Sequence, residues 1–285
     1  MGYLHIDNLY KEQTILMFKE CYALEKIHGT SAHIKWNSKD KVLNFFSGGE
    51  SHKKFTALFN IDSLYKYLLN NFIDSDVVVY GEAYGGSQQK MSKTYGNILK
   101  FIAFDVKINQ YWLNVTNAEN VCQKLNIDFV DYVNISTDLE SINYERDRES
   151  TQAIRNGCGG GKIREGIILR PLQEFTMNNG NRIISKHKRD EFKETNTQRE
   201  VSDEYFKVLE DAKEITEEWV TEMRLHHILD KIKAPNLEKI PLVIKSMIED
   251  IYREGKGEIV ESREVTRSIG KRTAIMFKNY LKNSF

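Results

Sequence analysis

The chain has 285 residues, of which 40% are hydrophobic and 29% charged, a composition typical of a soluble globular protein with one large or two modest domains. Its 41 basic and 41 acidic residues cancel, which excludes a global attraction to nucleic acid and leaves only local basic patches for such contacts. Three scattered cysteines, Cys21, Cys122 and Cys158, exclude a disulfide framework and suit a reducing compartment. We expect neither a signal peptide nor a membrane span.

The first two hundred residues predict a succession of strands with a few helices. Residues 3–24 mix apolar and charged positions and predict a helix or loop. Alternating or β-branched residues predict strands at 31–36, 41–46, 76–80, 101–106, 111–113, 166–170 and 182–186. Helical spacing of apolar residues predicts helices at 61–72 and 117–126. The glycine-rich and basic segment 146–164 predicts a surface loop.

The pattern changes near residue 200. Apolar residues keep a 3.6-residue period through 205–219, 225–232, 243–251 and 269–281, and Pro235 and Pro241 separate these runs. We therefore predict two domains, residues 1–198 and 199–285, of which the second is all helical.

The hexapeptide from Glu25 to Thr30 contains a candidate nucleophile, Lys26, followed by His28 and the turn residue Gly29. A lysine amine is almost fully protonated at neutral pH, so a site that uses it as a nucleophile needs neighbouring cations or partial burial. An exposed lysine before a turn is the simpler interpretation of this stretch taken alone.

Four later stretches could complete a site around this lysine. Three carry a carboxylate at a predicted strand: Gly81-Glu82, Phe104-Asp105 and Glu165-Gly166. The fourth, Lys186-His187-Lys188, places two lysines on one face of a strand because side chains alternate with period two. Carboxylates for a hard cation or ribose hydroxyls, an aromatic face for a base and cations for a phosphate indicate phosphoryl or nucleotidyl transfer.

The order and spacing of these five stretches resemble the covalent nucleotidyltransferases, the superfamily of DNA ligases, RNA ligases and mRNA capping enzymes. Most of that superfamily has aspartate at the position of His28, whereas histidine followed by Gly-Thr resembles the RNA ligase 2 family, which includes phage RNA ligases and RNA-editing ligases. The resemblance covers roughly residues 20–190 and extends more faintly into the tail.

The resemblance implies an α+β fold: an ATP-grasp-like nucleotidyltransferase domain of antiparallel sheets with flanking helices, followed by an all-helical domain for nick engagement. It implies an ATP-dependent RNA ligase that forms a covalent lysine-AMP intermediate, transfers AMP to an RNA 5′-phosphate and joins it to a 3′-hydroxyl at nicks in duplex RNA. The implied cofactors are ATP and Mg²⁺, with Mn²⁺ as a substitute. We expect a cytoplasmic monomer whose partner is RNA, without contact to membranes.

The resemblance also implies roles for individual residues. Lys26, Lys186, Lys188 and Glu165 are the implied catalytic residues, and Glu165 is the implied metal ligand. The implied nucleotide-binding residues are Glu25, Lys26, Ile27, Ser31, Glu82, Phe104, Lys186 and Lys188. The residues assigned to RNA binding or sealing are Lys53, Lys54, Asp105, Arg224, Asp250 and Glu254.

Two departures from the family pattern concern recognition of the RNA end. The family usually has an arginine about twenty residues after the nucleophile, and here that region reads Phe45-Phe46-Ser47-Gly48-Gly49, with Lys53 or Lys54 as substitutes. The family often has asparagine where this chain has Ser31. Neither departure concerns the adenylation step.

Two alternatives remain open from the sequence. An mRNA guanylyltransferase would use the same lysine with GTP, although the helical period after residue 200 differs from the β-barrel that normally follows its core. A non-catalytic RNA-binding module with a decayed site is the second alternative, against which the retained Lys26, Glu165, Lys186 and Lys188 argue.

Overall fold

The structure is a computed structural model that describes residues 2–177, 180–192, 203–232, 234–256 and 259–283. It divides into two compact units. The first comprises Met1–Ile15 and Glu20–Arg199, and the second comprises Leu16–Lys19 and Glu200–Phe285. The predicted boundary between residues 198 and 199 lies outside the described residues.

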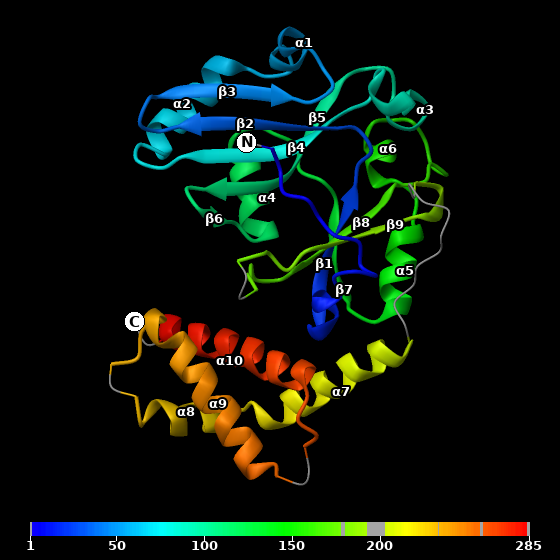
Figure 1. The fold of residues 1–285 in the computed structure, drawn as a ribbon. Coiled ribbons are helices and arrows are strands. Elements are labelled where there is room, and N and C mark those ends of the chain that lie inside the picture. Colours follow the sequence, from blue (N-terminus) through cyan, green and yellow to red (C-terminus); the bar gives the residue numbers. More distant parts are fainter. Residues whose placement is uncertain (1, 178–179, 193–202, 233, 257–258, 284–285) are drawn as a thin grey trace. The chain divides into compact units, whose positions relative to one another are not determined.

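Two antiparallel sheets form the centre of the first unit (Figure 1). The four-stranded sheet has the order β7-β1-β8-β9, from Tyr132–Ser136, Glu20–Lys26, Gly166–Pro171 and Ser185–Lys188. The five-stranded sheet has the order β3-β2-β4-β5-β6, from Val42–Ser47, Thr30–Asn37, Val77–Tyr84, Lys100–Ile108 and Tyr111–Trp112. The short turn from Ile27 to Gly29 joins β1 to β2 and so connects the two sheets directly after the candidate lysine.

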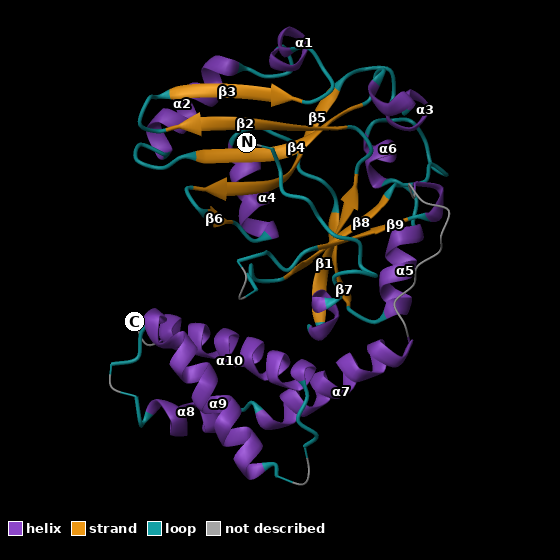
Figure 2. Ribbon diagram, viewed as in Figure 1, coloured by secondary structure: helices purple, strands orange, loops and turns teal. Residues whose placement is uncertain are grey.

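Helices flank the sheets of the first unit (Figure 2). They are α1 His52–Thr56, α2 Ile61–Asn71, α3 Ser92–Tyr95, α4 Val115–Lys124, α5 Leu139–Asp147 and α6 Thr151–Arg155. Side-chain oxygens of Asn60, Asn114, Asp138 and Ser150 accept hydrogen bonds from the first turns of α2, α4, α5 and α6 and so define where these helices begin. Buried apolar side chains of β2, α1 and α2, such as Trp36, Phe55 and Leu68, share one hydrophobic core.

The structure corrects two expectations about local structure. The helix or loop expected at residues 3–24 is mainly loop with a short 3-10 helix at Thr14–Met17, but the expectation is wrong at its end, where β1 begins at Glu20. The segment 146–164 is not a simple surface loop, since α6 lies within it and Arg164 is 1% exposed. The Arg164 guanidinium donates to Glu145 at 2.7 Å, and a buried ion pair of this kind anchors the segment to α5.

The second unit is all helical, as the 3.6-residue period predicts. Its helices are α7 Asp203–Trp219, α8 Glu222–Leu229, α9 Ile240–Glu254 and α10 Arg263–Asn283. The apolar residues with this spacing pack together in a separate hydrophobic core, which includes Val243, Met247 and Ile251 of α9. The fold class expected from the sequence, α+β followed by helices, is confirmed. No helix among the described residues has both the length and the apolar character needed to cross a membrane.

Candidate active site

The candidate nucleophile lies at the end of β1, where strand register brings two other predicted residues beside it. Lys26 pairs with Gly166 of β8, and Gly166 pairs with Lys188 of β9. Directly paired residues on neighbouring strands point to the same face, so Lys26 and Lys188 share a face of the sheet. A Cβ atom at Gly166 would lie 2.2 Å from the His187 carbonyl oxygen, so only glycine allows this close approach of β8 and β9.

Glu165, which precedes β8, holds the cations together. Its carboxylate accepts from Lys26 Nζ at 2.9 Å and from Lys188 Nζ at 3.0 Å, and it lies 3.0 Å from His28 Nδ1. Burial alone would raise the pKa of Glu165, but the hydrogen bond from His28 and the Lys26 ammonium outweigh it and lower the pKa to about 2. Glu165 is therefore an anion at neutral pH and serves as a counterion, not as a proton acceptor.

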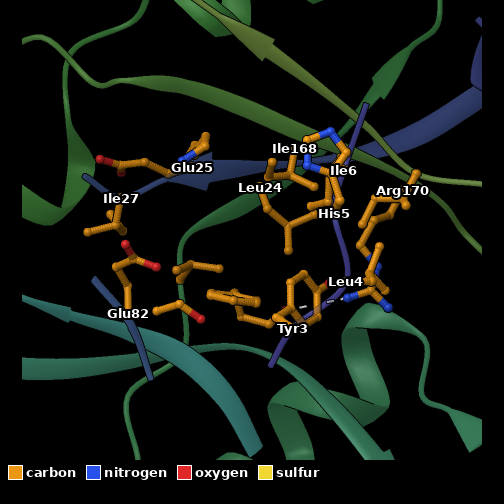
Figure 3. Close-up of a pocket in the computed structure, with 15 residues that line it drawn as sticks. Tyr3, Leu4, His5, Ile6, Leu24, Glu25, Ile27, Glu82, Ile168 and Arg170 are labelled. Carbon is orange, nitrogen blue, oxygen red and sulfur yellow. Dashed lines mark hydrogen bonds between the residues drawn. The ribbon is translucent and has the colours of Figure 1, made fainter. Parts of the chain in front are cut away.

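A cavity of about 380 Å³ opens beside Lys26 between the two sheets. This volume lies within the range of about 300–1,000 Å³ usual for small-molecule sites. Figure 3 shows Ile27 and Glu82 at one end of the cavity, Arg170 at the other end and Tyr3 between them. The remaining lining residues are Leu4, His5, Ile6, Leu24, Glu25, Lys26, Ser31, Phe104, Val130, Ile168 and Ile184.

A β-bulge aims Phe104 into this cavity. The register of β4 and β5 shifts between Tyr80, which pairs with Asp105, and Gly81, which pairs with Ala103, so Phe104 is the extra residue. A bulge breaks the alternation of side chains and re-aims one of them, which occurs often beside functional sites. Phe104 thereby lines the cavity, in the position of an aromatic wall.

Asp105, which the sequence assigns to RNA binding or sealing, is instead fully buried behind Phe104. Its carboxylate accepts from Tyr3 Oη at 2.7 Å and from Arg182 at 2.6 Å, and Arg170 lies at 3.1 Å. Glu174 pairs with both arginines and completes the cluster. A carboxylate with no exposed surface and three such partners supports the end of the cavity and does not face solvent.

Tyr3, Arg170 and Arg182 are site residues that the sequence does not identify. The Tyr3 ring meets the edge of Phe104 with centroids 4.9 Å apart, so it supports the aromatic wall. Its segment is fixed to β9, since the Lys186 N–H donates to the Asp7 carbonyl and the Leu9 N–H to the Lys186 carbonyl. Nothing in the local pattern near residue 3 signals this contact, whereas Arg170 is a charged residue within the apolar strand β8, a pattern that points to a functional or buried charge.

Glu82 lies on β4 at the Lys26 end of the cavity. Its Oε1 accepts from the Gly29 N–H at 3.1 Å, which ties the turn after the lysine to β4. Burial, opposed mainly by the charge of Lys26, raises the pKa of Glu82 to about 7. Ser31 of β2 pairs with Glu82 and lines the cavity beside it, so the two can offer oxygen atoms to one ligand.

Glu25 and Ile27, the neighbours of Lys26, lie differently from each other. Ile27 is a buried wall of the cavity. The Glu25 carboxylate points away from the cavity and accepts from Ser150 Oγ at 2.5 Å and from the Gln152 N–H at 3.1 Å (Figure 3). Glu25 therefore anchors the start of α6, and only its backbone is available to a bound nucleotide.

The remaining residues predicted for the first unit are less central. Lys186 pairs with Ile168, a cavity residue, and so shares the face that carries Lys188. Lys53 and Lys54 lie on α1, both exposed, and Lys54 Nζ lies 3.5 Å from Glu50. The structure does not bring these two lysines into the cavity lining.

In the helical unit the three predicted residues form one cluster. Arg224 of α8 donates to Asp250 at 2.6 Å and to Glu254 at 2.9 Å, and its Nε donates to the Trp219 carbonyl. The Arg224 side chain is 17% exposed, so these contacts join α8 to α9. The cluster therefore stabilises the packing of α8 against α9.

Glu165 is the side chain that best fits a divalent cation. Magnesium often binds through one or two carboxylates together with substrate phosphates, so one buried carboxylate beside Lys26 suits that mode. Among the described residues no group of three or more His, Cys, Asp or Glu side chains is arranged to hold a metal by itself. The residues fit a cation that binds jointly with a nucleotide.

A lysine amine, a buried glutamate and a second lysine beside a nucleotide-sized cavity define a candidate nucleotidyltransferase site. A family model described as RNA ligase matches residues 19–188, more than half of the chain and all five stretches. This chain belongs to the RNA ligase family. A search of curated proteins finds no match.

Solved structures of a Naegleria gruberi RNA ligase share the fold. A variant with ATP and Mn and the protein with PPi each align with a TM-score of 0.52 at 14% identity, covering 67% of this chain and 57% of theirs. A variant with AMP and Mn aligns with a TM-score of 0.51 over the same shares. This chain thus spans less than two thirds of the Naegleria chain, and identity this low establishes a common fold only.

Proposed function

We propose that this protein is an ATP-dependent RNA ligase that works through a covalent lysine-AMP intermediate. The observation that carries the proposal is the position of Lys26 Nζ, 2.9 Å from Glu165 and at the edge of a cavity large enough for a nucleotide. Membership in the RNA ligase family supports the same conclusion, as do the nucleotide complexes of the Naegleria ligase.

The adenosine of ATP occupies the cavity in this proposal. Adenine stacks on Phe104, an interaction worth about 1–3 kcal/mol. The ribose hydroxyls meet Glu82 and Ser31, which lie side by side on β4 and β2. The triphosphate then lies toward Lys26, Lys186 and Lys188, the cations of the shared sheet face.

Lys26 starts the reaction by attack on the α-phosphorus of ATP. A bond forms between Nζ and phosphorus, the bond from phosphorus to the bridging oxygen breaks, pyrophosphate leaves, and the ammonium nitrogen of Lys26 loses two of its three protons. Because Glu165 binds the Lys26 ammonium and has a pKa of about 2, these protons pass to better acceptors such as solvent or the leaving pyrophosphate. Lys188, which shares Glu165 with Lys26, can neutralise the charge that builds on the phosphate.

Two further transfers complete the joining of RNA. The RNA 5′-phosphate attacks lysine-AMP, which breaks the nitrogen–phosphorus bond and forms an AMP–RNA pyrophosphate linkage. The 3′-hydroxyl then attacks the RNA phosphate, a phosphodiester forms, and AMP leaves. Glu165 would hold Mg²⁺ or Mn²⁺, which supplies charge neutralisation at the phosphates.

Labelling of the denatured protein tests the first step. Full-length protein with Mg²⁺ should become labelled from α-labelled ATP and not from GTP, which would also separate it from an mRNA guanylyltransferase. Lys26→Ala and Lys26→Arg should both abolish the label, since arginine keeps the charge but is never deprotonated in proteins. Lys66→Ala, an exposed lysine on α2, is the matched control and should label normally. Label that survives on either Lys26 variant would assign the nucleophile elsewhere.

The substrate part of the proposal is a nick in duplex RNA. His28-Gly29-Thr30 resembles RNA ligases, and duplex RNA is recognised mainly through its shape, 2′-hydroxyls and phosphates. Pre-adenylated protein should seal a nick with an RNA 3′-hydroxyl side much faster than the all-DNA nick of the same sequence. Equal rates would move the protein to the DNA ligase branch. We propose further that the helical unit engages the nick, that the protein is a monomer and that it acts in the cytoplasm.

A further inference from the structure

A row of aromatic rings crosses the five-stranded sheet on the face that carries the cavity. It consists of Phe46 on β3, His33 on β2, Tyr80 on β4 and Tyr3, and we call it the aromatic row. His33 pairs with both Phe46 and Tyr80. Ring centroids are 5.0 Å apart between Phe46 and His33, 5.7 Å between His33 and Tyr80, and 5.1 Å between Tyr80 and Tyr3.

The two ends of the aromatic row differ in exposure. Tyr3 contacts Phe104 inside the cavity, and His33 and Tyr80 are 8% and 5% exposed. Phe46 is 48% exposed and packs in neither hydrophobic core of the described residues. Its ring lies nearly parallel to His33, at 25°. Cross-strand aromatic pairs stabilise sheets, but that role does not require one face of the last ring to remain open to solvent.

The next row of side chains along the same face contains two lysines. Lys35 lies between Asn44 and Val78, and Lys107 lies between Val78 and Trp112. Lys107 Nζ is 5.1 Å from the centre of the Trp112 ring. Asp105 pairs with Tyr80 of the aromatic row, and Arg170 and Arg182 neutralise the negative charge of its carboxylate. An open aromatic face beside lysines is the combination that binds single-stranded nucleic acid.

Burial, with a smaller contribution from Lys35, lowers the pKa of His33. The imidazole is therefore neutral at pH 7, and the positive charge on this face comes from the lysines. A neutral ring stacks on Phe46 without repelling those lysines.

The aromatic row lies one step from the cavity. Ser31 and Glu82, which line the cavity, are two residues from His33 and Tyr80 on the same strands. Side chains two residues apart on a strand are separated by about 6.5–7 Å, which equals about two nucleotides at about 3.4 Å per stacked base. Phe46 lies near the end of β3, beside the start of β2, and its 48% exposure shows that its ring is open to solvent there. Figure 1 shows β2 and β3 side by side in the five-stranded sheet.

We propose that Phe46, backed by His33 and flanked by Lys35, stacks a nucleobase that is displaced from the RNA duplex near the joint. The proposal rests on the proposed ligase function and deepens it. Every base has a π-face, so this contact holds the RNA end without reading its sequence. It also gives a role to the region Phe45–Gly49, where the resemblance leads one to expect an arginine and the chain has none.

Variants of Phe46 in the full-length protein test the proposal. Phe46→Leu keeps an apolar side chain but lacks a π-face, and Phe46→Trp offers a larger one. Binding to a nicked RNA duplex without ATP should weaken about 5- to 150-fold in Phe46→Leu, the range of one base–aromatic stack, and remain close to wild type in Phe46→Trp. Tyr111→Ala is the matched control, because Tyr111 is a 67% exposed aromatic residue on β6 next to Trp112 and points to the other face of the sheet.

2-Aminopurine placed at each of the three nucleotides on either side of the nick reports the stacking directly. The fluorescence of one position should change on binding to wild type and Phe46→Trp but not to Phe46→Leu. Equal affinity of Phe46→Leu and wild type, or a fluorescence change that does not depend on Phe46, would overturn the proposal. So would a wild-type dimer that Phe46→Leu converts to a monomer, because the face would then bind a second copy.

Lysine-AMP formation separates this proposal from the proposed function. Phe46→Leu should label from ATP at the wild-type rate, because Phe46 lies outside the cavity lining. A wild-type protein that fails to label would refute the ligase function itself. Normal wild-type labelling with an equal loss of labelling and RNA binding in Phe46→Leu would refute only the RNA contact.

Discussion

Replacement of Glu82 by glutamine should remove a pH dependence of stability that this one carboxyl creates. Burial raises the pKa of Glu82 from 4.5 to about 7 in the folded protein, so folding favours its neutral form. The unfolded chain loses this proton near pH 4.5, whereas the folded protein retains it until about pH 7. The stability that depends on the neutral carboxyl is therefore complete below pH 4.5 and is lost as the pH rises from 4.5 to 7.

The magnitude follows from the two pKa values. A difference of about 2.5 pKa units corresponds to a penalty of about 3.4 kcal/mol when Glu82 is fully ionised. At pH 5 the penalty is about 0.8 kcal/mol and at pH 8 about 3.3 kcal/mol, so the wild type should lose about 2.5 kcal/mol of stability between these pH values through Glu82. Glu82→Gln cannot ionise and keeps an oxygen that accepts from the Gly29 N–H.

Urea unfolding at pH 5, 6, 7 and 8 measures this difference. Tryptophan fluorescence follows the unfolding. In a Trp219→Phe background the signal comes only from Trp36 and Trp112, which both lie in the unit that contains Glu82. The free energy of unfolding of Glu82→Gln minus that of wild type should rise by about 2.5 kcal/mol from pH 5 to pH 8.

Glu140→Gln, which removes an exposed glutamate of α5, is the control and should give a profile parallel to wild type. Parallel profiles for Glu82→Gln and wild type would refute the reasoning, because they would mean that the Glu82 carboxyl is as well solvated in the folded protein as in the unfolded chain.

Three further predictions concern the supports of the site and the two units. Asp105→Asn should lower the free energy of unfolding by about 3–5 kcal/mol, because it leaves two buried arginines without their shared anion; a loss below about 1 kcal/mol in urea unfolding would contradict this. In the helical unit, a double-mutant cycle of Arg224→Ala and Asp250→Ala should give a coupling energy of about 0.5–3 kcal/mol, and strict additivity would show that their ion pair contributes nothing. A chain that ends after residue 199 should still form lysine-AMP but seal RNA poorly, since all five stretches precede that point; full sealing would remove the role proposed for the helical unit, and loss of labelling would show that adenylation needs both units.

The sequence by itself could predict the elements and the main reacting groups. Each of the stretches around Lys26, Glu82, Phe104, Glu165 and Lys188 has a local pattern that indicates a strand or a turn. The period of two places Lys186 and Lys188 on one face, and the register of β8 and β9 agrees with that expectation. The period of 3.6 likewise predicts the helical unit without knowledge of its packing.

Several features depend on contacts between residues far apart in the chain, and the sequence does not predict them. Tyr3 reaches Asp105 across 102 residues, and no periodicity near residue 3 reports this contact. Asp105 looks available for RNA from its place at a strand end, but two arginines and burial remove it from solvent. Arg164 belongs to a basic, glycine-rich segment and is nevertheless buried, because Glu145 offers it an ion pair.

The same limit applies to the direction of single side chains. Alternation alone turns the Glu25 carboxylate to the face opposite Lys26, but only the packed chain shows that it anchors α6 there. Phe104 faces the cavity only because a bulge in β5 interrupts that alternation. Local patterns determine which elements form, since they arise from backbone geometry and the burial of one face. Register, bulges and long-range partners determine what each side chain meets, since these depend on how the whole chain packs.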